Sequence, residues 1–339
     1  MKLARVPKHD AERVRRRLFM LGIARKDAGI SCDRSSIFVP LKDGVDDRVG
    51  EMGIDVVEGD APLQSCYRSP LEMVAERAEI PEVLKKHLPR KWELFGDVLI
   101  LKMPGELQHV RSKVAEAYAG VLGAKTVCEE TGVIEGEHRT PSLRVLVGND
   151  TETVHLENGI RYRFDVAKIM FSSGNVYERQ LMGELDCRSQ TVVDMFAGIG
   201  YFTLPIALKS GAERVFACEI NPVSFHYLRE NIALNGAEDR VETFLGDNRD
   251  FPGRRIADRV IMGYLGNTWA FLPKAFDVAR KGGVIYYHES CPIDLLPERP
   301  IQRILESAGG RECEIVRVRK VKSFRPSTTH VVVEARVLD

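Results

Sequence analysis

The chain has 339 residues, too many for one average domain, so two or three domains are expected, each with its own hydrophobic core. Its 49 basic and 49 acidic residues balance, so the total charge gives no sign of a nucleic-acid partner. The seven cysteines lie far apart without a C-x-x-C pair, so neither a metal site nor a disulfide framework is expected. This use of cysteine predicts that the protein resides in the reducing cytoplasm. No apolar run is long enough to cross a bilayer, so no membrane partner is expected.

The N-terminal segment concentrates basic charge. The first 26 residues hold nine Lys or Arg, against two acids. Residues 10–21 predict a helix with its apolar side chains on one face and Arg13, Arg16 and Arg17 off it. A strand is expected at 36–40, and an acidic loop or linker at 42–62. Residues 1–68 thus predict a small α/β domain whose arginines are either an ordinary solvated face or an RNA contact.

Residues 69–165 predict a middle α+β domain, ending in a hairpin at 153–164 around Asn158-Gly159. Helices are expected at 81–89 and 107–122, and strands at 97–103, 125–128 and 143–147. A two-residue hairpin loop would place Val154 and Leu156 opposite arginines. A three-residue loop from Glu157 to Gly159 would place them opposite apolar side chains, so we favour the longer loop.

Residues 166–339 alternate strand and helix. Strands are expected to begin near Thr191, Arg214, Val241, Asp258 and Gly283. This order predicts a doubly wound parallel sheet. Two last strands, at 313–321 and 329–337, are expected to pair antiparallel at one edge.

A glycine turn follows the first of these strands. The apolar run ends at Asp194, and Gly198 and Gly200 lead into a predicted helix. Glycines let the backbone approach a ligand closely, and the free N–H groups of a helix start favour electronegative groups. A nucleotide-like ligand is therefore expected beside this turn.

Carboxylates also follow the next two strands. Glu219 ends the second, where a carboxylate can grip a ribose diol. Asp247 and Asn248 follow the third, where an acceptor and an amide suit an adenine edge. The absence of a G-x-G-x-x-G pattern disfavours a dinucleotide.

Four ordered stretches carry a family resemblance: residues 168–179, 194–200, 247–251 and 258–264. They resemble the tRNA wybutosine-synthesis family, which includes the tRNA guanine-37 N1-methyltransferases and the archaeal tRNA 4-demethylwyosine aminocarboxypropyltransferase. The resemblance implies an α/β fold with a class I methyltransferase-like, Rossmann-like doubly wound sheet and an antiparallel edge, preceded by small α+β domains. It implies S-adenosyl-L-methionine as cofactor and the anticodon loop of tRNA, with tRNA-Phe expected, as partner of a monomeric enzyme.

The resemblance also implies the site residues. The expected cofactor-binding positions are Ser172, Arg179, Asp194, Gly198, Gly200, Glu219, Asp247 and Asn248. Arg179 has the fork that suits the methionine carboxylate, although an ion pair with Glu178 or Asp165 is the ordinary alternative. Glu178 and His288 are the catalytic candidates, as acceptors of a released proton, although a lone histidine at a strand end is more often structural.

Two features of the sequence distinguish the two branches of this family, and they point to different branches. Gly263-Tyr264-Leu265 stands where the methyltransferases resemble Asn-Leu-Pro, and together with Tyr287-His288 it resembles the aminocarboxypropyl branch. The basic N-terminal domain resembles the methyltransferases. Because the site decides the chemistry, we expect transfer of the 3-amino-3-carboxypropyl group to 4-demethylwyosine at position 37, with release of 5′-methylthioadenosine. Guanine-37 methylation is the alternative, and a non-catalytic binding module a third.

Overall fold

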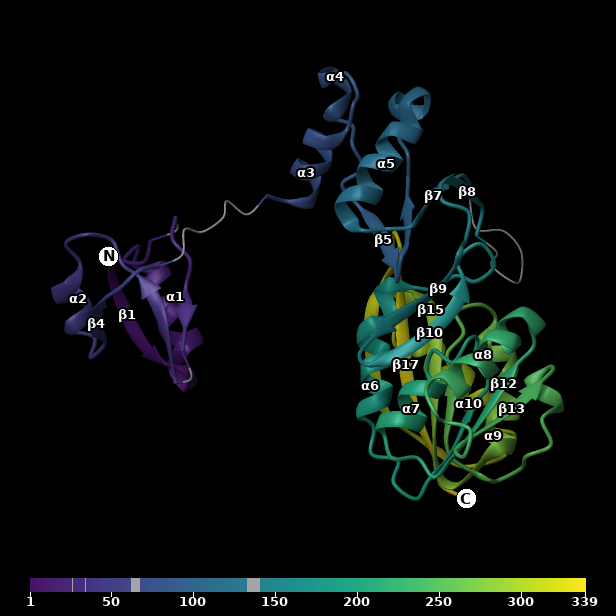
Figure 1. The fold of residues 1–339 in the computed structure, drawn as a ribbon. Coiled ribbons are helices and arrows are strands. Elements are labelled where there is room, and N and C mark those ends of the chain that lie inside the picture. The colour runs from purple at the N-terminus through teal and green to yellow at the C-terminus, as the bar shows by residue number, and fades with distance from the viewer. Residues whose placement is uncertain (26, 34, 62–67, 133–140) are drawn as a thin grey trace. The chain divides into compact units, whose positions relative to one another are not determined.

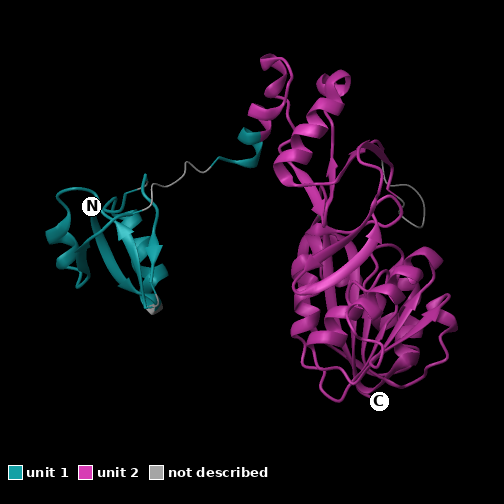
Figure 2. Ribbon diagram, viewed as in Figure 1, with its two compact units in different colours: residues 1–73 teal, residues 74–339 magenta. Residues whose placement is uncertain are grey.

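The computed structural model describes residues 1–25, 27–33, 35–61, 68–132 and 141–339. The chain divides into two compact units, Met1–Met73 and Val74–Asp339 (Figures 1 and 2). Within these ranges no helix is long and apolar enough to cross a membrane. The boundaries expected near residues 68 and 165 stay predictions.

The first unit is an antiparallel sheet with two helices. The strand order is β2-β3-β1-β4. The elements are β1 (Lys2–Pro7), η1 (Lys8–Asp10), α1 (Ala11–Met20), β2 (Ser31–Cys32), β3 (Ser36–Pro40), α2 (Asp46–Gly50) and β4 (Asp55–Glu58). The expected helix and the strand at 36–40 are present, and α1 buries Val14 and Leu18 in the core of this unit.

The loop expected over 42–62 is wrong in its described part, because α2 and β4 lie there. Val49 is fully buried, and Ile54 and Val56 pack against the same core as α1. The acidic side chains between these apolar residues face solvent and hid a short helix and an edge strand. Charge on one face of an element is therefore no sign that the segment lacks structure.

The boundary between the units lies within α3, and the second unit continues with a small four-stranded sheet in the order β5-β6-β7-β8. Its elements are α3 (Pro70–Arg77), α4 (Glu82–Lys85), β5 (Trp92–Phe95), β6 (Val98–Leu101), η2 (Gly105–Val110), α5 (Arg111–Leu122), β7 (Thr126–Glu130) and β8 (Leu143–Val147). Strands β6 and β7 are parallel, with α5 as their crossover, and α5 buries Val114 and Tyr118. The helix expected from residue 107 starts with a 3₁₀ turn, and β5 was not expected.

The hairpin of β9 (Glu152–Glu157) and β10 (Ile160–Asp165) has the shorter loop, so the favoured three-residue loop is wrong. Asn158 and Gly159 both have positive φ, as a two-residue hairpin turn requires. The register pairs Leu156 with Arg161 and leaves Leu156 65% exposed. Glu157 points inward instead, because it forms a buried ion pair with Arg179. A polar contact distant in sequence thus overrode the apolar pairing.

The C-terminal sheet has seven strands in the order β13-β12-β11-β14-β15-β17-β16. Its elements, with the helices between them, are η3 (Ser173–Asn175), α6 (Val176–Glu184), β11 (Thr191–Asp194), α7 (Thr203–Lys209), β12 (Arg214–Glu219), α8 (Pro222–Leu234), β13 (Val241–Leu245), η4 (Asn248–Asp250), β14 (Ala257–Met262), η5 (Thr268–Phe271), α9 (Leu272–Val278), β15 (Ala279–Pro292), η6 (Ile293–Leu295), α10 (Glu298–Ser307), β16 (Cys313–Arg325) and β17 (Thr328–Val337).

This arrangement confirms the expected doubly wound sheet with an antiparallel edge. Strands β11 to β15 are parallel to one another, and β17 pairs antiparallel with both β15 and β16. Successive residues of β11, β12 and β14 belong alternately to two buried apolar clusters, so both faces of the sheet are covered and the central strands are mostly apolar. The carboxyl ends of β11, β12 and β14 consequently meet at one edge, where ligands of such sheets bind.

The buried pair of Arg179 and Glu157 predicts a strong effect on stability. Glu157→Ala leaves the guanidinium, whose residue is 2% exposed, without its carboxylate, which should cost about 3–5 kcal/mol of unfolding free energy. Urea unfolding, monitored by tryptophan fluorescence, measures the unfolding free energy of the second unit, because Trp92 and Trp269 both belong to it. The control Glu314→Ala removes the exposed partner of Arg336 and should cost less than about 1 kcal/mol. Equal effects of the two changes would contradict the role of the buried pair.

Candidate functional site

The glycine turn after β11 is shaped by positive φ angles. Gly198 has φ +57° and Gly200 has φ +102°. A Cβ on Gly198 would lie 2.6 Å from the ring of Tyr201, so a side chain is excluded there. The Tyr201 hydroxyl donates a hydrogen bond to the Met170 carbonyl at 2.6 Å, which ties the turn to the segment before α6.

Glu219, at the end of β12, holds this turn from the side. Its Oε2 accepts a hydrogen bond from the N–H of Gly198, and its Oε1 accepts one from the N–H of Asn221, both at 2.7 Å. The carboxylate is half-buried at the mouth of the turn. Glu219 therefore fixes the backbone of the turn, and its binding of ligand hydroxyl groups stays a prediction.

Asp194 is fully buried beneath the turn. It accepts hydrogen bonds from the Phe196 N–H at 3.2 Å and the Thr203 hydroxyl at 2.8 Å. Burial raises its pKa to about 6, although both hydrogen bonds act in the opposite direction. These contacts make Asp194 a brace of the turn that joins β11 to α7.

Asn248 has a side-chain oxygen that is available to a ligand. Its Nδ2 donates to the Met195 carbonyl at 2.7 Å, while its Oδ1 is buried without a hydrogen-bond partner in the described structure. An unmatched buried acceptor is costly, and an exocyclic amino group such as that of adenine would satisfy it. The neighbouring Asp247 forms an ion pair with Arg249 and caps the short η4 turn. The residues present therefore fit an adenine nucleoside.

Arg179 forms its ion pair with a residue that the sequence did not suggest. Its Nε and Nη2 donate to the two carboxylate oxygens of Glu157 at 2.6 and 2.7 Å, and Nη2 also donates to the Ser172 carbonyl at 2.9 Å. The guanidinium carbon lies 4.5 Å from the centre of the Phe171 ring. The ion pairs considered with Glu178 and Asp165 are not the ones formed. Binding of a methionine carboxylate by Arg179 stays a prediction.

The two catalytic candidates are also held by partners that sequence reasoning missed. Glu178 is 1% exposed and forms a two-pronged ion pair with Arg319 of β16. His288 is 1% exposed, and its Nδ1 lies 3.0 Å from Nε2 of His330. Burial lowers the pKa of each imidazole to about 3, so both are neutral at pH 7. Neither Glu178 nor His288 stands as a free base, and no local sequence signal links them to partners on the last two strands.

The end of β14 has no room for a side chain at residue 263. A Cβ on Gly263 would lie 2.4 Å from Cε2 of Phe202, which occupies that space. The next ring, Tyr264, stacks on Phe196 with 5.3 Å between centroids. Aromatic rings therefore wall the edge of the site where an amide would otherwise stand.

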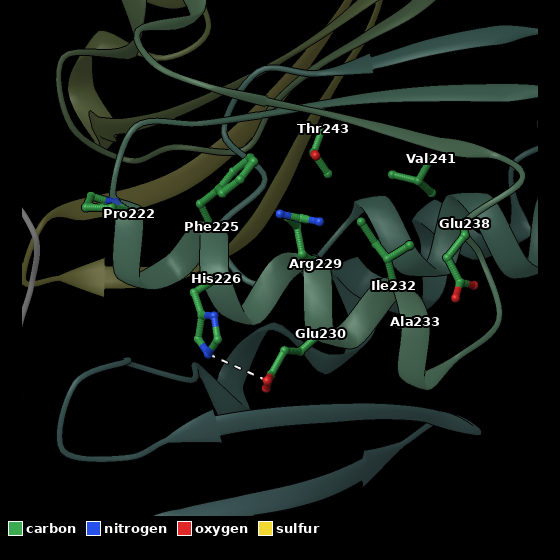
Figure 3. A pocket seen from close by; sticks show the side chains of 10 residues that line it. All are labelled: Pro222, Phe225, His226, Arg229, Glu230, Ile232, Ala233, Glu238, Val241 and Thr243. Atoms are coloured by element: carbon green, nitrogen blue, oxygen red, sulfur yellow. Dashed lines mark ion pairs between the residues drawn. The ribbon is translucent and has the colours of Figure 1, made fainter.

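A groove runs along the outer side of α8 (Figure 3). Phe225, Arg229 and Ile232 face Val241 and Thr243 of the edge strand β13 there. It contains none of the expected site residues. Across the described ranges no cluster of three His, Cys, Asp or Glu side chains could hold a metal ion.

The glycine turn, the carboxylate at the end of β12 and the open amide of Asn248, on this seven-stranded sheet, define a class I S-adenosylmethionine-dependent transferase. Residues 153–316 match the family model "TRM5/TYW2 methyltransferase domain", and residues 72–151 match "TYW2 N-terminal domain". The chain belongs to the TRM5/TYW2 family of tRNA-modifying enzymes.

Similar proteins come from both branches of the family. A tRNA(Phe) (4-demethylwyosine(37)-C(7)) aminocarboxypropyltransferase of Pyrococcus horikoshii is 47% identical over 261 residues, which are 76% of this chain and 93% of that protein. The crystal structure of P. horikoshii TYW2 in complex with MeSAdo has a TM-score of 0.71 at 44% identity, covering 79% and 98% of the two chains. The tRNA (guanine(37)-N(1))-methyltransferase Trm5b of Pyrococcus abyssi is 35% identical over 98% of both chains. Its crystal structure has a TM-score of 0.72 and covers both chains fully.

Glu219→Ala tests the nucleoside site. Loss of the carboxylate removes charge-assisted hydrogen bonds to vicinal hydroxyls, so S-adenosylmethionine affinity should fall about tenfold or more, roughly 1.4 kcal/mol. Isothermal calorimetry measures the change. Glu242→Ala is the control, since it removes an exposed carboxylate from the neighbouring strand. Unchanged affinity in folded Glu219→Ala protein would rule out this role.

Asp194 predicts a pH-dependent stability. Its pKa is about 6 in the folded chain against an ordinary 3.8, so folding favours the protonated form. Its contribution is full below pH 4 and is lost as the pH rises through 6, a change of about 3 kcal/mol. Asp194→Asn lacks this equilibrium, so the unfolding free energy of the variant minus that of the parent should increase between pH 4 and 7. Parallel pH profiles in urea unfolding would refute the raised pKa.

Proposed function

We propose that the chain transfers the 3-amino-3-carboxypropyl group of S-adenosylmethionine to C7 of 4-demethylwyosine at position 37 of tRNA-Phe, and releases 5′-methylthioadenosine. The P. horikoshii relative that bears the name of this activity is 47% identical over 93% of its length. The reaction is a step of wybutosine synthesis. The protein is expected to act on the anticodon loop as a monomer.

The observation that carries the proposal is the filled space at Gly263. A side chain there would meet the Phe202 ring at 2.4 Å, so no amide can stand at the end of β14 to present a guanine edge. A buried base donor left without its partner would cost about 1 to 3 kcal/mol. The aromatic wall of Phe196, Phe202 and Tyr264 instead offers ring faces, which suit a tricyclic base.

The chain's own residues bind and orient. Bound S-adenosylmethionine supplies a sulfonium with three carbon arms, of which one is transferred. We expect Glu219 to hold the ribose and Asn248 the adenine, which would fix the position of the sulfur; the unpartnered Asn248 Oδ1 and the carboxylate beside Gly198 support this. The glycine turn allows the ligand to approach the backbone. Which arm reacts then depends on how the rest of the ligand is turned toward the base, because orientation supplies much of the rate.

We regard Glu178 and His288 first as residues that hold the structure around the site, and only second as acceptors of a proton. Arg319 occupies both oxygens of Glu178, and His288 is neutral and hydrogen-bonded to His330. The attack itself needs no strong base. Because Arg319 occupies both oxygens of Glu178, His288 is kept as the candidate for accepting the proton that the substituted base releases.

The N-terminal unit is proposed to contact the tRNA backbone. Arg13 and Arg16 of α1 are both 72% exposed, and nearby acids Asp10 and Glu12 form surface ion pairs with them. Such exposed pairs are weak and exchange readily for phosphate contacts. The arginine face is thus compatible with RNA binding, as the local excess of basic charge suggests.

Methylation of guanine 37 is the second candidate, and one observation favours it. The P. abyssi methyltransferase matches 98% of this chain, including the N-terminal unit, whereas the P. horikoshii aminocarboxypropyltransferase matches 76%. An accessory unit can be shared by enzymes with different chemistry. The site at Gly263 therefore has the greater weight.

The spent cofactor distinguishes the two reactions. With tRNA that carries 4-demethylwyosine, chromatography should show 5′-methylthioadenosine in a ratio of about one to each modified tRNA, because the aminocarboxypropyl arm leaves the sulfur. With tRNA that carries unmodified guanine 37, little turnover is expected. S-adenosylhomocysteine as the main product, above all with unmodified tRNA, would establish the methyltransferase alternative instead.

A further inference from the structure

Trp269 is a large aromatic side chain on the surface of the second unit. It belongs to η5, and the residue is 47% exposed. Its ring is supported by Arg303, whose guanidinium carbon lies 5.4 Å from the ring centre. A cation over an aromatic face is attracted to it, which restrains the ring. An exposed tryptophan that is supported in this way presents a flat apolar surface to a partner.

The support of this ring is anchored inside the protein. Glu289 of β15 is 2% exposed, and its Oε1 accepts hydrogen bonds from Arg303 at 2.7 Å and from Arg299 at 2.8 Å. Its Oε2 accepts one from the Tyr287 hydroxyl at 2.7 Å. One buried carboxylate thus fixes two guanidiniums, of which one contacts Trp269. Two positive charges against one negative leave an excess that favours a phosphate group.

The acidic side chains of α10 follow a different line along the helix. Arg299 and Arg303 are four residues apart and therefore share one face. Glu298 and Glu306 are in line with Gln302, which donates a hydrogen bond to Glu306 at 2.7 Å. The two arginine side chains are 27% and 30% exposed, so part of each is open to an anion.

Trp269 also adjoins the aromatic wall at the end of β14. The Thr268 hydroxyl donates a hydrogen bond to the Tyr264 carbonyl. The Phe271 ring lies 5.0 Å from the Phe196 ring, centre to centre. These contacts fix η5 to two residues of the wall that receives the reacting base in the proposed function. A nucleotide that stacks on Trp269 would thus adjoin the one that reacts.

We propose that Trp269 stacks on an unpaired nucleobase next to the reacting base, and that Arg299 and Arg303 lie along the phosphate of that nucleotide. The inference rests on the proposed function, because it places a second nucleotide of the same RNA substrate. Only an unpaired, unstacked base offers its face to a side chain. Stacking accepts any base, since every base has such a face. The platform therefore holds the RNA loop without reading its sequence.

Fluorescence reports this contact directly, because the chain has two tryptophans. Trp92→Phe keeps an aromatic ring beside Tyr118 and leaves Trp269 as the remaining tryptophan. Addition of tRNA that carries 4-demethylwyosine should quench the emission of this variant, since a stacked base quenches indole fluorescence. The quenching should follow the binding curve from filter binding. The same tRNA with abasic sites on both sides of position 37 should quench far less.

Affinities of matched variants separate stacking from other contacts. Trp269→Ala should weaken binding of the intact tRNA about tenfold and that of the abasic tRNA very little, because the stacked base is already missing there. Trp269→Phe should keep most of the affinity, since a ring remains. The control Leu305→Ala removes an exposed apolar side chain of α10 and should change neither affinity. S-adenosylmethionine affinity, measured by calorimetry, should be the same for all of these variants.

Two results would overturn the stacking platform. One is binding of intact tRNA to the Trp92→Phe variant with unquenched emission, and the other is an equal loss of affinity for intact and abasic tRNA in Trp269→Ala. The fluorescence measurement leaves Trp269 in place, so it decides the question even if Trp269→Ala does not fold. Failure of the parent protein to bind tRNA would refute the proposed function, and the platform with it.

Discussion

The buried ion pair between Arg179 and Glu157 is the interaction on which the rest of the site depends. One guanidinium binds the last residue of β9, holds the Ser172 carbonyl and covers the Phe171 ring. It therefore fixes the register of the hairpin, the start of α6 and the turn between them at once. Desolvation makes such a pair expensive to form and more expensive to break, so the three segments can move only together.

Glu178, next to Arg179 in the sequence, links α6 to a different part of the structure. Glu178 binds Arg319 of β16, so one turn of α6 joins the hairpin to the antiparallel edge of the large sheet. The neutral imidazoles of His288 on β15 and His330 on β17 contact each other between neighbouring strands of the same edge. Arg179 and Glu178 are thus each paired with an opposite charge at the start of α6. Both pairs hold this segment in place, and a pre-oriented surface lowers the cost of binding a ligand.

The sequence predicted those features that depend on local patterns of residues. The apolar strands, the glycine turn and the carboxylate at Glu219 follow from short segments, and the family resemblance supplied the cofactor and the chemistry. The hairpin register failed because Glu157 pairs with a residue 22 positions away. Arg319 lies 141 residues from Glu178, and His330 lies 42 from His288. Such pairs depend on which strands the topology makes neighbours, and periodicity carries no information about that.

Two enzymes that share this scaffold need differ only in how the sulfonium is turned. Gly263 and Phe202 close the place where an amide would align a guanine with a methyl group. The site expected to bind the nucleoside, around Glu219 and Asn248, would serve either reaction equally. Similarity over the entire chain consequently measures the shared scaffold and the accessory unit, whereas the chemistry depends on a few positions at the strand ends. A relative that matches nearly the whole chain and a relative of higher identity over a shorter stretch can therefore differ in activity.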